Sequence, residues 1–376
     1  MVAPRRVLST CVRRRMTFRA DDIRSWVPMI SFLQVLLPAL VTLAIGCGAS
    51  SRQHLAIERL RRHVSTLADD SLEGRNAGYR GEARAADYIA EHFQRIGLEP
   101  ILRDSSGTPT YLQAFDFAPR RAPENGVFVP QPADMRSQNV LGLLRGADPL
   151  RASTFIVVCA HHDSQGIEGQ TDPGRLPLDA ETRRRSNGIW NGADDDASGV
   201  GVLLEVAQRL ASQRLPPANS VLFASFGAEE HGLFGYRWLI DSTLPGPGGG
   251  GAEYYVRNAP FDLSTHIAVL DLEMLGRNPT NDPELYVPES GGWADAAKLA
   301  TGRTGLRVRV IERVEECCNH IAFHRRGVPA ALLGVPGNRD HYHHPDDEAE
   351  YIAYGRLAQI ARWVEALVIA LAEQGS

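Results

Sequence analysis

The sequence contains few cysteines, only five among its 376 residues. Cys11 and Cys47 lie in the first 50 residues, which leaves Cys159, Cys317 and Cys318 for the rest of the chain. Three cysteines are too few for a disulfide framework, so the fold must depend on its hydrophobic core. Cys159 lies in an apolar run, which predicts burial. The adjacent pair Cys317 and Cys318 is compatible with a strained disulfide, two thiols or a soft-metal site, and we favour two thiols.

The chain also lacks a basic stripe interleaved with aromatic residues, and its arginine clusters are short. Its 40 Lys and Arg residues stand against 45 Asp and Glu residues, a net charge of −5. This balance gives no reason to expect a nucleic-acid partner. No internal repeat is visible, and the one low-complexity segment, residues 245–251, predicts a flexible loop. With 43% hydrophobic residues, the composition is typical of a soluble globular protein that buries a sizeable core.

The N-terminal part has the pattern of an export signal. An arginine-rich start precedes a mostly apolar run over residues 26–45, and this run ends at Gly46-Cys47. The order resembles the signal peptide of bacterial lipoproteins, in which the cysteine becomes the lipidated first residue of the mature chain. The alternative is an uncleaved membrane anchor, which is disfavoured because two prolines and a glutamine interrupt the apolar run.

These observations predict three parts of the chain. We expect a lipoprotein signal peptide at residues 1–46, a short linker at 47–53 and one domain at 54–376. The protein is then exported and anchored to a membrane by a lipid on Cys47, on the periplasmic or cell-surface side.

Beyond the linker, the hydrophobic pattern alternates between helix and strand. A Pro- and Gly-rich stretch over residues 100–132 interrupts this pattern. The patterns predict helices over residues 54–67, 81–96, 198–211, 293–301 and 352–372, and strands over residues 139–144, 154–160, 220–226, 266–272, 307–311 and 330–333. This alternation predicts an α/β fold, a three-layer sandwich in which helices flank a mostly parallel, mixed sheet.

Residues 191–210 carry the most concentrated charge of the chain. Asp194, Asp195 and Asp196 precede Ser198 and an apolar pattern of helical spacing. One of these carboxylates, or Ser198, is a candidate N-cap for the helix. Capping needs only one carboxylate, however, and three adjacent carboxylates repel one another unless they share a cation. The stretch therefore favours a metal site over capping alone.

Polar side chains also follow four of the predicted strands. Ligands of open α/β sheets bind at the carboxyl ends of the strands, so these side chains should meet at one edge. Imidazole and carboxylate groups together suit zinc or a similar divalent ion. The four sets are His161-His162-Asp163, Glu229-Glu230-His231, Asp271 with Glu273, and His341-Tyr342-His343-His344.

The order of these motifs carries a family resemblance. The chain contains HxD, GADDxASG, AEExGLxG, (D/E)MxGR and YHxPxD in succession. This succession resembles the co-catalytic zinc exopeptidases, a family that includes bacterial leucine aminopeptidases and glutamate carboxypeptidase II, with glutaminyl cyclases as relatives. The lead-in segment DSLEGRNAG, residues 70–78, is also similar to the segment before the catalytic core in many members.

The resemblance implies two Zn²⁺ ions per chain and assigns residues of this chain as their ligands. His161 would bind one ion, His343 the other, and Asp195 would bridge them. Glu230 would be a further ligand. Glu273 stands where members often have Asp before Met-x-Gly, and it is the expected fifth ligand.

Further roles follow from the same resemblance. Asp271, two residues before Glu273 on the same strand face, is the alternative fifth ligand. Asp163 would orient the ring of His161, as partners of metal-bound imidazoles do. Glu229 would be the general base, and Tyr342 would stabilise the oxyanion, with a purely packing role for its ring as the alternative.

The expected activity is hydrolysis of N-terminal peptide bonds by zinc-activated water, with a peptide or small amide as the substrate. Three alternatives remain open. A glutaminyl-peptide cyclotransferase would keep the fold and one zinc, a carboxypeptidase would use the same centre on the other peptide end, and a non-catalytic relative would only bind metal. The complete ligand set argues against the cyclotransferase and the non-catalytic protein.

Two features receive no catalytic role. Residues 165–187 form a long segment between the first two motifs, which could wall the substrate cleft, and its arginines at 183–185 are interpreted as a solvated face rather than as a reader of a substrate carboxylate. His162, His341 and His344 are interpreted as neighbours of the ligands.

Overall fold

The computed structural model describes residues 51–117, 135–171, 175, 178–232, 250–337 and 341–374. The predicted signal peptide and residues 47–50 of the predicted linker lie outside these residues. The chain divides into two compact units, Met1–His54 and Leu55–Ser376, and the elements below belong to the second. Within the described part of the chain, no helix combines the length and the apolar character needed to cross a membrane.

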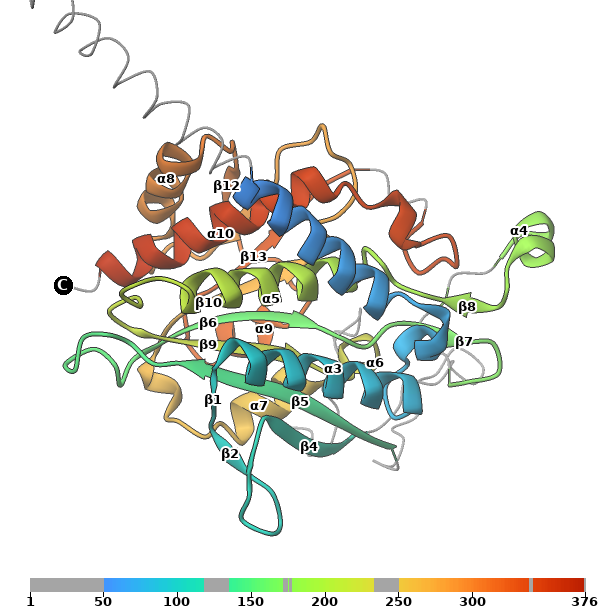
Figure 1. Cartoon of the computed structure of the whole chain (residues 1–376), viewed down its shortest axis with the longest axis horizontal. Helices are drawn as coiled ribbons and strands as arrows, with labels where there is room; N and C mark the ends of the chain where they lie inside the picture. The colour runs from blue at the N-terminus through green and yellow to red at the C-terminus, as the bar shows by residue number, and fades with distance from the viewer. Residues whose placement is uncertain are drawn as a thin grey trace, which may run out of the picture. The chain divides into compact units, whose positions relative to one another are not determined.

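A mixed sheet lies at the centre of the second unit (Figure 1). Its strands are β1 (Glu99–Pro100), β4 (Leu112–Phe117), β5 (Met135–Leu144), β6 (Phe155–His161), β9 (Ser220–Phe226), β10 (His266–Glu273), β11 (Glu284–Val287), β12 (Arg309–Glu312) and β13 (Ala330–Gly334). In the described residues the order is β1-β5-β9-β6-β10-β13-β11-β12, and β4 pairs with β5. The central strands β9, β6, β10 and β13 are parallel, whereas β5 and β11 join this core antiparallel.

Helices and short ribbons complete the unit, and residues 55–67 are also helical. Two ribbons pair β2 (Leu102–Arg103) with β3 (Pro109–Thr110) and β7 (Gly166–Ile167) with β8 (Ile189–Trp190). The labelled helices are η1 (Asp70–Arg75), α3 (Arg80–Ile96), α4 (Ala180–Arg185), α5 (Ala197–Ala211), α6 (Glu229–Gly232), α7 (Gly251–Arg257), η2 (Leu263–Thr265), α8 (Trp293–Thr304), α9 (His320–His324), η3 (Ala349–Tyr351) and α10 (Tyr354–Gln374).

Both faces of the sheet are buried, because alternate residues of each strand pack into different clusters. Ile156 and Val158 of β6 pack in one cluster with α3, α5 and α10. Phe155 and Val157 of the same strand pack in a second cluster with α7 and α9. The predicted three-layer α/β sandwich is therefore confirmed.

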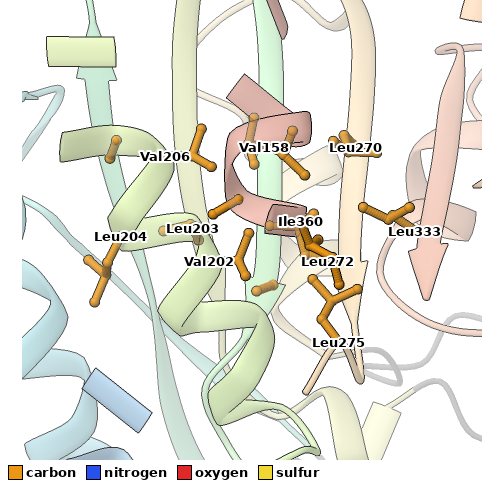
Figure 2. Packing of buried hydrophobic residues seen from close by; sticks show 14 of the residues in the cluster. Val158, Val202, Leu203, Leu204, Val206, Leu270, Leu272, Leu275, Leu333 and Ile360 are labelled. Atoms are coloured by element: carbon orange, nitrogen blue, oxygen red, sulfur yellow. The ribbon is translucent and has the colours of Figure 1, made fainter. Parts of the chain in front are cut away.

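Helix α5 is fixed firmly against the sheet. Val202, Leu203 and Val206 of this helix lie in the same cluster as Val158 of β6 and Leu270 of β10 (Figure 2). All five side chains are 0% exposed. Because interiors pack at crystal-like density, the start of α5 and the aspartates before it have little freedom to move.

Most predicted elements are present, with shifted ends. The predicted strand at 220–226 has the observed bounds of β9, and the strand predicted from residue 139 already begins at Met135. β4, β11, α7 and α9 were not predicted. They are short, with seven residues or fewer each, so their hydrophobic periodicity is weak. Gly250 and Gly251, expected in a flexible loop, lie at the start of α7.

Candidate metal centre

The carboxyl ends of the parallel strands bring the predicted ligands to one edge of the sheet. His161 is the last residue of β6 and pairs in register with Phe226 at the end of β9. Glu273 is the last residue of β10 and pairs with Gly334 of β13. Glu230 follows β9, His343 follows β13, and Asp195 lies between β8 and the start of α5, so tertiary structure brings motifs that are distant in the sequence to one place.

Three of the predicted ligands form a first group. His161 Nε2 lies 3.2 Å from Asp195 Oδ1 and 3.6 Å from Glu273 Oε2. One ligand atom from each of these residues lies within 4.8 Å of the other two. One imidazole and two carboxylates converge here on a common point, as the donors of a single divalent ion do.

A second group shares Asp195 with the first. His343 Nε2 lies 3.4 Å from Asp195 Oδ2 and 3.1 Å from Glu230 Oε2. The three residues also place one ligand atom each within 4.8 Å of the others. Since one oxygen of Asp195 faces His161 and the other faces His343, this carboxylate has the geometry of a bridge between two sites.

The residues at the centre fit divalent cations. Asp195 Oδ2, both carboxylate oxygens of Glu230 and Glu273 Oε2 are buried and accept no hydrogen bond from the described part of the chain; imidazole nitrogens are the groups that face them. Buried carboxylate oxygens without donors are costly unless a cation binds them. Nitrogen and oxygen donors in this combination suit zinc.

The pKa values of these residues also reflect how close the buried carboxylates and imidazoles lie to one another. Burial, outweighing the nearby His161, raises the pKa of Glu273 to about 7. Burial alone would lower the pKa of His343, but Glu230 and Asp195 raise it to about 11. Without a metal, these carboxylates therefore favour the protonated form of the His343 ring, which faces them at 3.1 Å and 3.4 Å.

Of the three adjacent aspartates, only Asp195 belongs to the ligand groups, so the structure does not bring all three together at one cation site as their repulsion had suggested. Asp194 accepts hydrogen bonds from the amide of Gly276 (2.7 Å) and the hydroxyl of Ser198 (3.2 Å). Asp196 is the N-cap of α5 and accepts from the amide of Gly199 at 3.0 Å. Main-chain and hydroxyl donors thus stabilise two of the carboxylates, and only Asp195 belongs to the two ligand groups.

Asp163 holds two of the ligand segments together. Its carboxylate oxygens accept hydrogen bonds from the amides of Glu229 (3.0 Å) and Glu230 (3.1 Å). The Nδ1 atom of His161 lies 3.1 Å from the main-chain oxygen of Asp163 and 3.6 Å from its carboxylate. The ring is therefore positioned mainly by the carbonyl, and the carboxylate orients the turn that carries Glu229.

Glu229 and Tyr342 lie beside the ligand groups without belonging to either. Burial, together with the charges of nearby carboxylates, raises the pKa of Glu229 well above its usual range. Burial and the charges of Asp195 and Glu230 also raise the pKa of Tyr342. The Tyr342 ring stacks on His343, with 3.8 Å between ring centroids. Both side chains thus lie close enough to the centre for the carboxylates to act on them.

Asp271, the alternative fifth ligand, belongs to neither ligand group. Its fully buried carboxylate accepts hydrogen bonds from the amide of His320 (2.9 Å) and from Asn319 Nδ2 (3.2 Å). The Sγ atom of Cys159 lies 3.5 Å from the same carboxylate. Asp271 therefore anchors the start of α9, and Glu273 occupies the position at the centre.

Two residues at the centre were not assigned a role from the sequence. Asp347 accepts hydrogen bonds from the amides of Asp194 (2.9 Å) and Asp195 (3.0 Å), and Arg277 contacts it at 3.0 Å. Asp347 is the last residue of the YHxPxD motif, so this motif was the signal in the sequence from which a role for Asp347 could have been predicted. Its carboxylate fixes the main chain on both sides of the bridging aspartate.

Arg75 is the second such residue and is 0% exposed. Its guanidinium donates to the main-chain oxygens of His162 (2.9 Å), Asn191 (2.6 Å), Gly192 (2.9 Å) and Leu67 (2.5 Å). Burial lowers the pKa of Arg75 to about 10, although four surrounding aspartates oppose this shift. Arg75 belongs to the DSLEGRNAG segment, and it ties the end of β6 to the loop before Asp195.

The remaining histidines have other partners. His162 Nδ1 contacts Ser225 Oγ at 3.0 Å, so it is a buried neighbour of the ligands, as predicted. His341 and His344 form a separate, partly exposed group with Asp346. Arg185 pairs with Asp346, and the arginines at 183–185 are exposed, which agrees with the predicted solvated face.

Comparisons with known proteins agree with this architecture. Aminopeptidase YwaD of Bacillus subtilis (strain 168) is 26% identical over 241 residues, which are 62% of this chain and 44% of YwaD. The chain thus spans less than half the length of that relative. The structure of BSAP, a zinc aminopeptidase from Bacillus subtilis, has a TM-score of 0.58 at 19% identity and covers 83% of this chain and 94% of BSAP.

Porphyromonas gingivalis glutaminyl cyclase has the same TM-score of 0.58, at 18% identity, with 83% of this chain and 97% of the cyclase covered. At such identities these structures show a shared fold and nothing finer. The sequence itself matches a family over residues 139–368, more than half of the chain, and this range includes every residue of both ligand groups. The chain therefore belongs to Peptidase family M28.

Proposed function

We propose that this chain is a zinc-dependent exopeptidase that removes N-terminal residues from peptides. The observation that carries the proposal is Asp195, whose two carboxylate oxygens face two buried imidazoles in two ligand groups. Membership of Peptidase family M28 and the similarity to an aminopeptidase and a zinc aminopeptidase support it.

Each ligand group would hold one zinc ion. His161, Asp195 and Glu273 would bind the first, and Asp195, Glu230 and His343 would bind the second. Zinc at such a site polarises a substrate carbonyl and lowers the pKa of bound water to near neutrality. The hydrogen bonds of the main chain to Asp163 and Asp347 keep the ligands oriented before the metal arrives.

Glu229 would act as the general base. Its buried carboxylate lies beside the ligand groups, a position that suits a group that accepts a proton from water and then donates it to the leaving amine. Its main-chain amide donates a hydrogen bond to the Asp163 carboxylate, and this bond fixes the main chain that carries the Glu229 side chain. Tyr342 would donate its phenolic proton in a hydrogen bond to the developing oxyanion.

A glutaminyl-peptide cyclotransferase is the main alternative, since the cyclase structure fits the fold as well as BSAP does. The presence of both complete ligand groups favours the hydrolase, because a one-zinc enzyme has no need of a carboxylate shared between two imidazoles. Carboxypeptidase action uses the same centre and is separated from aminopeptidase action only by the substrate pocket.

The test is mass spectrometry of a mixed peptide pool after incubation with the zinc-loaded chain, with and without a chelator. The proposal predicts chelator-sensitive loss of N-terminal residues. Shortening at the C-terminus would identify a carboxypeptidase, and loss of ammonia from N-terminal glutamine would identify a cyclotransferase. An unchanged pool would contradict the proposed hydrolysis.

A matched pair of variants tests the base. Glu229→Gln should keep its zinc and lose hydrolysis by at least about a hundredfold, because positioned proton transfer contributes about 10²–10⁴-fold. Glu91→Gln removes the same charge from an exposed glutamate on α3 and should leave hydrolysis unchanged. Retained hydrolysis in the Glu229 variant would refute its assignment as the base.

We also propose that the protein acts outside the cytoplasm, held to a membrane by a lipid on Cys47. The support is the sequence pattern alone, an apolar run that ends at Gly46-Cys47. Expression of the full chain in bacteria with a labelled fatty acid should label the wild type but not Cys47→Ala. Equal labelling of both would refute lipidation at this cysteine.

A further inference from the structure

The adjacent cysteines Cys317 and Cys318 are the feature of the sequence that the proposed activity leaves unused. Their Sγ atoms lie 3.0 Å apart, and both are free thiols. Cys317 is half-buried, so reagents can reach it from solvent, whereas Cys318 is buried at 6% exposure. The favoured prediction of two thiols therefore agrees with the structure, but the sulfurs are close enough to react with each other.

The pair directly precedes residues that are hydrogen-bonded to β10, the strand that ends at the metal centre. The hydrogen bond with Cys317 and burial, followed by the charge of Glu273 and later that of Glu229, raise the pKa of Cys318. Carboxylates of the centre thus act electrostatically on this thiol. The residues that follow, Asn319 and His320, are hydrogen-bonded to Asp271, two positions before Glu273 on β10. These hydrogen bonds therefore connect the cysteine segment to the strand that ends at the centre.

We propose that Cys317 and Cys318 form a modification site that exchanges with small disulfides and thereby alters zinc binding at the centre. In the first step the sulfur of Cys317, as a thiolate, attacks one sulfur of a disulfide RSSR and expels RS⁻. In the second step the sulfur of Cys318 attacks Cys317 and expels the second RS⁻. Two cysteine thiols lose two protons and two electrons, and RSSR is reduced to two RSH.

The local geometry favours a labile bond. Closing the sulfurs from 3.0 Å to a disulfide length of about 2.05 Å needs a shift of about 1 Å. Neighbouring Cα atoms are only about 3.8 Å apart across a trans peptide, below the about 4.4 Å at which ordinary disulfides begin. Strained and accessible disulfides are the easily reduced, regulatory ones, so the modification should be reversible.

Cys159 is an internal control for this chemistry. It contacts the same Asp271 carboxylate but is fully buried, and no other cysteine is among its contacts in the described residues. It should stay reduced under conditions that oxidise the pair. Selective oxidation of the pair would therefore reflect proximity and access rather than a general susceptibility of the protein's thiols.

The experiment equilibrates the zinc-loaded full chain in buffers of oxidised and reduced glutathione. After acid quenching and alkylation, mass spectrometry of the peptide with Cys317 and Cys318 measures how much has lost two hydrogens and takes up no alkylating reagent. We expect this form to increase with oxidised glutathione, to disappear with dithiothreitol, and to be absent from Cys317→Ser. Full alkylation of both thiols at every ratio, or two separate glutathione adducts, would overturn the proposal.

Competition with a chromogenic chelator gives the second readout, and it does not depend on peptidase activity. Oxidation should weaken zinc retention by on the order of tenfold in the wild type, as loss of positioning around metal ligands costs about 10–100-fold. Cys317→Ser should retain zinc equally in both buffers. A disulfide that forms without any change in zinc retention would overturn the link to the centre, whereas failure of the proposed peptidase would leave both readouts intact.

Discussion

The buried guanidinium of Arg75 offers the sharpest test of how the centre is held. Its four hydrogen bonds reach main-chain oxygens on three separate segments, so Arg75→Met leaves four buried carbonyls without this donor. With a charged donor, each such bond contributes about 1.5 kcal/mol at the low end, or about 6 kcal/mol in all. Burial opposes this gain: a pKa lowered from 12.5 to about 10 corresponds to about 3 kcal/mol. The variant should therefore lose about 3 kcal/mol of unfolding free energy.

Urea unfolding of the zinc-free chain measures this loss. With a slope of about 3 kcal/mol per molar urea, the midpoint should fall by about 1 M. The matched control is Arg80→Met on α3, because Arg80 is 73% exposed and pairs with Glu73 at the surface. A surface pair of this kind contributes about 0–1 kcal/mol, so the control midpoint should barely move. Equal midpoints for the two variants would refute the conclusion that the hydrogen bonds of Arg75 stabilise these segments.

Three further predictions concern the metal. Asp195→Asn should lose zinc from both ligand groups, because this residue belongs to both; zinc content after gel filtration measures it, and wild-type content would contradict the bridge. Glu273→Ala should lose zinc from one group while Asp271→Asn retains both, since Asp271 is hydrogen-bonded elsewhere; the opposite result would restore Asp271 as the ligand. Zinc should also displace a proton from His343. Burial alone would lower the pKa of His343. The surrounding carboxylates nevertheless raise this pKa to about 11, above the unfolded value of about 6.5. Its ion-pair stabilisation of the metal-free chain is thus present below about pH 6.5 and is lost as the pH rises through about 11. Zinc titrated into weakly buffered protein at pH 7 should release about one proton from this ring, and zinc affinity should rise with pH; a titration without proton release would contradict the pairing.

The sequence was sufficient for the fold and for the gathering of the ligands. Long hydrophobic runs have a period that local sterics fix, so β6, β9, β10, α5 and α10 could be predicted from their own residues. Once a parallel sheet is expected, the ends of its strands must share one edge. That rule placed His161, Glu230, Glu273 and His343 together although nearly two hundred residues separate the outermost two.

What each carboxylate does depended on partners that are distant in the sequence. Asp194 and Asp196 look equivalent to Asp195 in the sequence, and only the amides of residues 276 and 199 distinguish them. Asp271 and Glu273 share a strand face, but a step of two residues, about 7 Å, puts one under α9 and the other at the open end of the sheet.

The sequence by itself therefore determined which residue types would meet and at which edge of the sheet, because strand period and chain direction are local properties. Only the tertiary structure decided which carboxylates remained without donors and thus available to a metal. It also decided that Arg75 and Asp347 would hold the ligand segments, since hydrogen bonds to main-chain atoms leave no trace in residue spacing.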